Sequence, residues 1–133
     1  MKKILLDTHI FLWSILDPSQ LSEAMANELE DPLNELWLSP ITIWEVMILS
    51  EKKLIQLDAP PLEWIKSVLS DLPFREAPLN FEIAMQSRSI NLPHKDPADR
   101  FIAATASVYH LILATADRNL IEGAITYSVF PNS

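Results

Sequence analysis

Acidic residues far apart in the sequence are the residues best suited to do chemistry in this chain. Asp7 directly follows the apolar run at residues 4–6, and Asp117 lies just past the apolar run at residues 111–114. If both runs are strands of one parallel sheet, these carboxylates meet at the sheet edge where ligands bind in open α/β folds. The alternative is that each Asp only begins a turn, which Asp does well.

Glu45 belongs to an apolar helical pattern. On a helix it shares one face with Ile41 and Leu49. A carboxylate within an apolar stripe is costly unless it is paired or bound to a cation. The alternative is a position at the rim of the core, from which Glu45 reaches solvent or an Arg.

Asp96 and Asp99 open the longest helical pattern of the chain. Asp96 followed by Pro97 is a good helix start, so Asp96 is predicted to be the N-cap. Asp99 lies one turn before the apolar residues Ile102 and Ala103 and is predicted to point toward the buried side. We therefore expect Asp99 to be a ligand, with Asp96 as a secondary candidate.

Convergence of Asp7, Glu45, Asp99 and Asp117 would require a counter-charge. Two unit charges 4 Å apart repel by about 4 kcal/mol at an effective dielectric of about 20. Such a cluster either takes up protons or binds hard cations. Oxygen ligands without His or Cys favour Mg²⁺ or Mn²⁺ over zinc. The chemistry that fits is metal-assisted attack of water on a phosphodiester.

The elements that must position these acids are short apolar strands alternating with helices. This order predicts an α/β domain in which helices cover both faces of a parallel sheet, and the 133 residues form one domain, 1–133. Strands are predicted at residues 4–6, 36–38, 74–77, 111–114 and 125–130. Helices are predicted at residues 10–16, 22–30, 40–50, 61–69, 80–90 and 97–109.

The composition excludes several classes of site. The chain has no Cys and one Gly, which rules out thiol chemistry, disulfides and Gly-rich phosphate loops. A net charge of −8 argues against indiscriminate nucleic-acid binding. No apolar run approaches the roughly 18 residues of a membrane-spanning helix, so we expect a cytoplasmic protein without a membrane partner.

Sequence blocks around the acids resemble the PIN-domain ribonucleases, and among them the VapC-like toxins of toxin–antitoxin pairs. The blocks are LLDTH at residues 5–9, LSPITIWE at 38–45, LPHKDPADRFIAA at 92–104 and LATADRNL at 113–120. They occur in the family's order and usual spacing over nearly the whole chain. The family's acidic quartet falls on the residues selected above.

The resemblance implies a three-layer α/β/α fold with a mostly parallel sheet and an endoribonuclease activity. In the family, the carboxylates hold Mg²⁺ or Mn²⁺, which activates the attacking water. Thr8 and Thr115 match positions whose hydroxyls support the metal or its waters, although Thr is also an ordinary capping residue. Such toxins usually form homodimers and are inhibited by a cognate antitoxin protein.

Other residues near the acids have two interpretations each. Lys95, Arg100 and Arg118 could contact RNA phosphates, or could form salt bridges with their acidic neighbours. Trp13 and Trp44 could stack on bases, but their apolar helices favour packing in the core or against a partner. His9 is interpreted as structural, and His94, which precedes the Asp96 cap, could touch the substrate.

The remaining alternative for the whole chain is a catalytically silent PIN-like module that binds or interacts without cleaving RNA.

Overall fold

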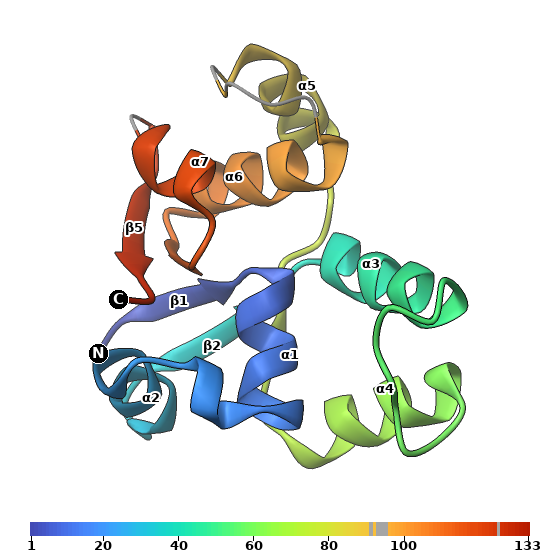
Figure 1. Ribbon diagram of the computed structural model, residues 1–133. Helices are drawn as coiled ribbons and strands as arrows, with labels where there is room; N and C mark the ends of the chain where they lie inside the picture. The colour runs from blue at the N-terminus through green and yellow to red at the C-terminus, as the bar shows by residue number, and fades with distance from the viewer. Residues whose placement is uncertain (91, 93–95, 125) are drawn as a thin grey trace.

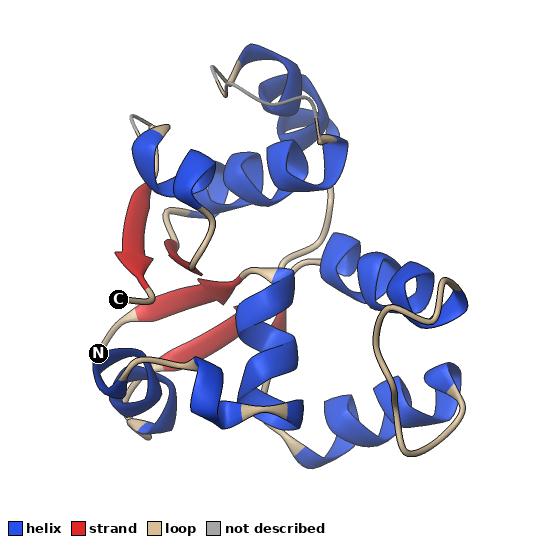
Figure 2. Cartoon of the chain, in the orientation of Figure 1, coloured by secondary structure: helices blue, strands red, loops and turns tan. Residues whose placement is uncertain are grey.

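The short apolar runs of the sequence form one parallel sheet. The computed structural model describes residues 1–90, 92, 96–124 and 126–133. Its strands are β1 (Lys3–Leu6), β2 (Glu35–Leu38), β3 (Arg75–Glu76), β4 (Ile112–Thr115) and β5 (Ser128–Pro131). They are ordered β3-β2-β1-β4-β5, and every neighbouring pair is parallel. Figures 1 and 2 show helices on both sides of this sheet.

The helices begin where the sequence supplies caps. They are α1 (Thr8–Leu16), η1 (Pro18–Gln20, a 3₁₀ turn), α2 (Glu23–Glu30), α3 (Pro40–Glu51), α4 (Pro61–Asp71), α5 (Phe81–Ser89), α6 (Pro97–Tyr109) and α7 (Arg118–Glu122). Six of them are preceded by a residue whose side chain accepts a hydrogen bond from the first turn; these caps are Asp7, Ser22, Ser39, Asn80, Asp96 and Asp117. Each cap satisfies a backbone N–H that the helix itself leaves unpaired.

Successive side chains of the central strands point to opposite faces of the sheet, and this divides the core into two layers. Leu5 of β1 and Leu113 of β4 pack in a buried cluster with residues of α5, α6 and α7. Ile4 and Leu6 of β1 pack on the other face, in a cluster with α1, α2, α3 and α4. Since successive side chains of a strand point to opposite faces, this confirms the predicted α/β/α layering.

The order of the strands determines where a site can form. From β1 the chain moves outward to β2 and β3, and it then returns to the other side of β1 to form β4 and β5. The direction in which new strands are added to the sheet therefore reverses between β1 and β4. In open α/β sheets, ligands bind outside the carboxyl ends of the strands at such a switch point.

The structure differs from the sequence expectations mainly in short elements. The turn η1 and the helix α7 were not predicted, because three to five residues carry too little periodicity to be recognised. The predicted strand at 125–130 is β5 at Ser128–Pro131, and Ile125 lies outside the described residues. Within the described ranges, no helix has both the length and the apolar character needed to cross a membrane.

Gly123, the single glycine of the chain, ends α7 in close contact with its surroundings. A Cβ at this position would lie 2.5 Å from Leu92 Cδ2 and 2.9 Å from the carbonyl oxygen of Asn119. We expect Gly123→Ala to lower the free energy of unfolding by about 1–3 kcal/mol, because part of the backbone must move to accept the methyl group. Urea denaturation measures this loss. An unchanged midpoint would show that Leu92 moves aside at no cost.

Candidate active site

A cavity of about 320 Å³ opens at the switch point of the sheet. Its lining is dominated by acidic residues from elements that are distant in the sequence. The lining residues are Asp7, Thr8, His9, Trp13, Glu45, Asp96, Asp99, Ala116 and Asp117. The fold therefore gathers all four predicted acids, together with Asp96, around one opening.

Asp7 connects the end of β1 to the start of α1. Its backbone N–H donates to the carbonyl of Ala114 at 3.0 Å, which holds the end of β1 against β4. Its Oδ1 accepts the N–H of Ile10 at 2.8 Å and caps α1. The side chain is only 5% exposed. Both interpretations of Asp7 therefore apply, because it caps a helix and also lines the cavity.

Thr115 links the acids that follow β1 and β4. Its hydroxyl donates to Oδ2 of Asp7 and accepts the backbone N–H of Asp117 at 3.0 Å. The carboxylate of Asp117 in turn caps α7 by accepting the N–H of Asn119 at 2.8 Å. Thr115 is fully buried, so this bridge fixes the two acids relative to each other.

Glu45 reaches the cavity from α3. The helix begins directly after β2, where Ser39 Oγ accepts the N–H of Ile41 at 3.0 Å. The hydroxyl of Thr8, the first residue of α1, donates to Oε1 of Glu45. The carboxylates of Asp7 and Glu45 each accept a hydrogen bond from a threonine hydroxyl, Thr115 for Asp7 and Thr8 for Glu45, which holds the carboxylate in place.

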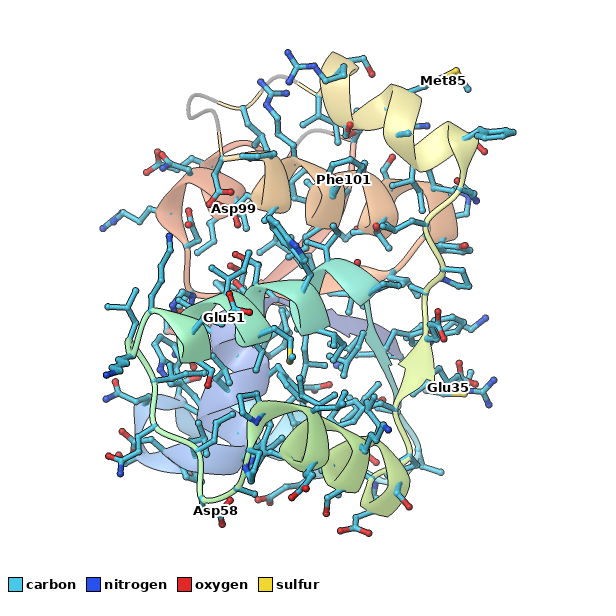
Figure 3. The ribbon with its side chains drawn as sticks, turned by 90° about the vertical axis from the view of Figure 1, so that its right-hand side faces the viewer. Glu35, Glu51, Asp58, Met85, Asp99 and Phe101 are labelled. Carbon is cyan, nitrogen blue, oxygen red and sulfur yellow. The ribbon has the colours of Figure 1, made fainter. Side chains whose placement is uncertain are left out.

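Asp96 and Asp99 come from the first turn of α6. Oδ1 of Asp96 accepts the N–H of Ala98 at 3.0 Å, as expected for the N-cap. Asp99 lies one turn further along and is half-buried. Figure 3 shows Asp99 at the start of α6, on the side of this helix that is nearer α3.

Burial and mutual repulsion raise the pKa values of the cavity acids. Burial raises the pKa of Asp7 to about 6, although its hydrogen bonds from Thr115 and Ile10 oppose the increase. Burial raises the pKa of Asp99 to about 7, with further increases from the negative charges of the other cavity acids. Burial also raises the pKa of Glu45, against the hydrogen bond from Thr8. The cavity therefore disfavours its own full ionisation.

The donor chemistry of the cavity fits a hard divalent cation. Five Asp and Glu side chains line the cavity, and their carboxylate oxygens are the ligands that such a cation prefers. A bound cation would also offset the repulsion from neighbouring acids that contributes to the raised pKa of Asp99. In the described part of the chain, no three acidic or His side chains are already close enough to hold a metal ion. The fit therefore rests on the type of donors and on their electrostatics.

Two of the predicted cations, Arg100 and Arg118, contact groups other than the cavity acids. One guanidinium nitrogen of Arg100, Nη1, donates to the carbonyls of Ser87 and Ile90 at 3.0 and 2.8 Å, at the end of α5. This structural role was not among the sequence interpretations of Arg100. Arg118 is 86% exposed and lies 3.7 Å from Glu122, in line with the salt-bridge interpretation. Lys95, and also His94, lie outside the described residues.

Two aromatic residues of the cavity were not expected at a functional site. His9 was interpreted as structural, but it is exposed and lines the cavity. Trp13, which was expected to pack in the core or against a partner, lines it as well. The spacing of four residues between them was the available signal, because residues i and i+4 share one face of a helix.

Replacing Arg100 tests its structural role. Arg100→Met removes two hydrogen bonds from a charged donor, although the Ile90 carbonyl still accepts the N–H of Leu92 at 3.1 Å. We expect a loss of about 1–3 kcal/mol in the free energy of unfolding. Arg118→Met is the matched control and should cost less than about 0.5 kcal/mol, since an exposed ion pair contributes little. Urea denaturation compares the two. Equal stability of both variants would contradict the role given to Arg100.

The raised pKa of Asp99 predicts a pH-dependent stability in the absence of metal. The pKa of Asp99 is about 7 in the folded chain against its ordinary value of 3.8 in the unfolded chain. The folded state therefore binds the proton more tightly, and the free energy of unfolding falls as pH rises from about 4 toward 7. In EDTA at pH 7, Asp99→Asn should stabilise the fold by about 1–2 kcal/mol, a value reduced for solvent screening.

The same variant should match the wild type near pH 3, where Asp99 is mostly protonated in both the folded and the unfolded chain. Asp58 is an exposed acid outside the cavity, so Asp58→Asn is the control and should change the free energy of unfolding at neither pH. A destabilised Asp99→Asn protein at pH 7 would show that the Asp99 carboxylate is held by favourable contacts that outweigh the repulsion.

Comparisons with known proteins agree with this architecture. The family model described as "PIN domain" matches residues 4–125. The chain is 33% identical over 123 residues to Ribonuclease VapC22 of Mycobacterium tuberculosis, with 90% of this chain and 91% of that protein covered.

Solved structures are similar over nearly the full length. One is VapBC2 from Rickettsia felis bound to a promoter DNA fragment, with a TM-score of 0.71, 16% identity and coverage of 97% of this chain and 98% of that chain. Another is FitAcB from Neisseria gonorrhoeae, with a TM-score of 0.67, 26% identity and 97% of each chain covered. Because the family match includes the strands and helices that form the acidic cavity, the chain belongs to the PIN-domain family.

Proposed function

We propose that this protein is a divalent-metal-dependent endoribonuclease and the toxin of a toxin–antitoxin pair. The observation that carries the proposal is the convergence of Asp7, Glu45, Asp99 and Asp117 around one cavity at the switch point of the sheet. The relative at 33% identity is a ribonuclease by name, and the solved VapBC structures are similar over nearly the whole chain. These likenesses support RNA as the substrate.

Asp7, Glu45, Asp99 and Asp117 are the residues that would hold Mg²⁺ or Mn²⁺, with Asp96 as a secondary ligand. When bound, the cation activates the attacking water and neutralises charge on the phosphate that is cleaved. Carboxylates of these residues offer the oxygen ligands that such ions prefer. The raised pKa of Asp99 means that cation binding displaces a proton near neutral pH, so metal affinity should increase with pH.

The residues around the acids keep the carboxylates in place. The hydroxyls of Thr8 and Thr115 donate to Glu45 and Asp7, and this limits the rotation of both acids. The first turns of α1 and α6 lie at the cavity through Thr8 and Asp99. Their positive helix ends partly offset the local negative charge and favour the approach of a phosphate.

The overall charge bears on how RNA is bound. At a net charge of −8, phosphate contacts cannot come from a broadly basic surface. Lys95 and Arg118 remain the predicted phosphate contacts, and Arg118 is exposed beside Asp117. We infer that binding depends on a particular RNA sequence or shape. The proposed site of action is the cytoplasm, where cellular RNA is found.

We propose that its protein partners are an antitoxin and a second copy of the chain. A solved toxin–antitoxin complex from Klebsiella pneumoniae is similar to this chain over 98% of its length, which supports the antitoxin. Several large apolar side chains are exposed, including Phe81 at 89% and Met85 at 68% on α5. Figure 3 shows Met85 at the outer surface of this helix. Exposed apolar patches are typical of surfaces that another protein covers.

The proposal is tested by incubating the purified protein with total bacterial RNA and sequencing the new 5′ ends. Discrete ends are expected with Mn²⁺, and none with EDTA or with Asp7→Asn, because the cation loses a charged ligand in that variant. Asn caps a helix about as well as Asp, so the thermal midpoint should remain close to that of the wild type. Asp58→Asn, far from the cavity, should cut like the wild type.

Two outcomes would contradict the proposal. Cleavage that persists in EDTA would exclude the metal-dependent mechanism. No new ends from folded protein freed of antitoxin would favour the catalytically silent binding module. Asp96→Asn adds a finer comparison, because a loss as severe as that of Asp99→Asn would place Asp96 among the metal ligands.

A further inference from the structure

One wall of the acidic cavity is aromatic. His9 and Trp13 both line it, and both come from α1. Their ring centroids are 5.8 Å apart with an angle of 52° between the planes. Carboxylates and a cation can act on a phosphodiester without such a surface, so the mechanism proposed above leaves these two rings unused.

The position of this wall is set by the same helix that carries the acids. Asp7 caps α1 and His9 lies in the first turn of this helix, so the backbone that carries the imidazole is held close to the Asp7 carboxylate. Trp13 is half-buried and packs with part of its surface against the core cluster under α1. The indole is therefore held in place while another part of it faces the cavity.

The other tryptophans differ in their surroundings. Trp64 is 6% exposed and belongs to the core. Trp44 is 53% exposed and lines a separate apolar cleft with Ile41 and Phe101, outside the acidic cavity. Trp37 stacks on Tyr109 at 6.3 Å. None of these three lines the acidic cavity, so only Trp13 combines a fixed ring with a position beside the carboxylates.

We propose that His9 and Trp13 bind the nucleobase of a nucleotide adjoining the scissile phosphodiester, by stacking. The inference rests on the proposed ribonuclease function and adds a subsite to it. Aromatic rings bind bases through their π-faces with little dependence on sequence. The cavity of about 320 Å³ lies within the usual range of about 300–1,000 Å³ for small-ligand sites. The base is thus held beside the acids that act on its phosphate.

The test uses a short RNA that contains one mapped cleavage site, together with matched RNAs that are abasic on either side of the scissile bond. In the wild type, one of the abasic RNAs should bind about ten-fold or more weakly than the intact RNA. Trp13→Ala should weaken binding of the intact RNA by a similar factor. Trp13→Ala should cause no further loss of affinity for that abasic RNA, because the contact between the indole and the base is already absent.

Conservative variants separate stacking from packing. Trp13→Phe and His9→Phe keep an aromatic ring and should retain most of the wild-type affinity, whereas His9→Ala should lose part of it. The loss is expected mainly in KM rather than in kcat, since the acids are unchanged. Trp44→Ala, which removes a tryptophan outside the cavity, is the matched control and should leave the difference between intact and abasic RNA unchanged.

Equilibrium binding by fluorescence anisotropy distinguishes failure of this inference from failure of the proposed function. Absence of cleavage by the wild type would contradict the ribonuclease function together with the inference that rests on it, whereas failure of the inference alone is seen with a wild type that cleaves. The inference is overturned if the Trp13→Ala protein binds the abasic RNA more weakly by the product of the two separate losses in affinity, because the ring and the base would then act independently. It is also overturned if Trp13→Ala leaves RNA affinity unchanged in a folded protein.

Discussion

Repulsion among buried carboxylates is the constraint on which the rest of the site depends. The chain brings Asp7, Glu45, Asp99 and Asp117 to one cavity whose lining, among the described residues, contains no Lys or Arg. Hydrogen bonds hold several of these acids in position despite that repulsion. Thr115 joins Asp7 to Asp117, and Thr8 holds Glu45. These hydrogen bonds restrict the acids before any ion binds, but within the described residues no three acidic or His side chains are close enough to hold an ion, so binding requires them to move closer together.

Helix capping and chemistry are performed by the same side chains. Asp7, Asp96 and Asp117 each accept hydrogen bonds from the first turn of the helix that follows. For Asp7 and Asp117 this arrangement follows from the fold, because α1 and α7 begin just past the carboxyl ends of the parallel strands β1 and β4, where ligands bind too. Substitution of such an acid therefore affects both stability and function unless the new residue can still cap. For this reason Asn is a more informative replacement than Ala at these positions.

The aromatic wall changes how α1 is understood. Its residues Ile10 and Phe11 belong to the buried core on one face of the sheet. Its first turns also place His9 and Trp13 at the cavity, beside the carboxylate of Asp7. One helix thus contributes to the core on one side and to the candidate site on the other. A site that combines charged and apolar walls is suited to a ligand with an anionic group next to a flat ring.

The sequence by itself determined the local features of this protein. Apolar runs and caps located most strands and helices, and oxygen-only ligands with no Cys indicated the type of metal. These features are local because they depend on neighbouring residues and on composition. Only the tertiary structure decided which side chains meet, such as Thr8 with Glu45 or Arg100 with the end of α5. Such contacts depend on the packing of elements distant in the sequence, and a side chain's type does not specify its partner. The same reason explains why His9 and Trp13 were assigned to structural roles until the cavity was seen.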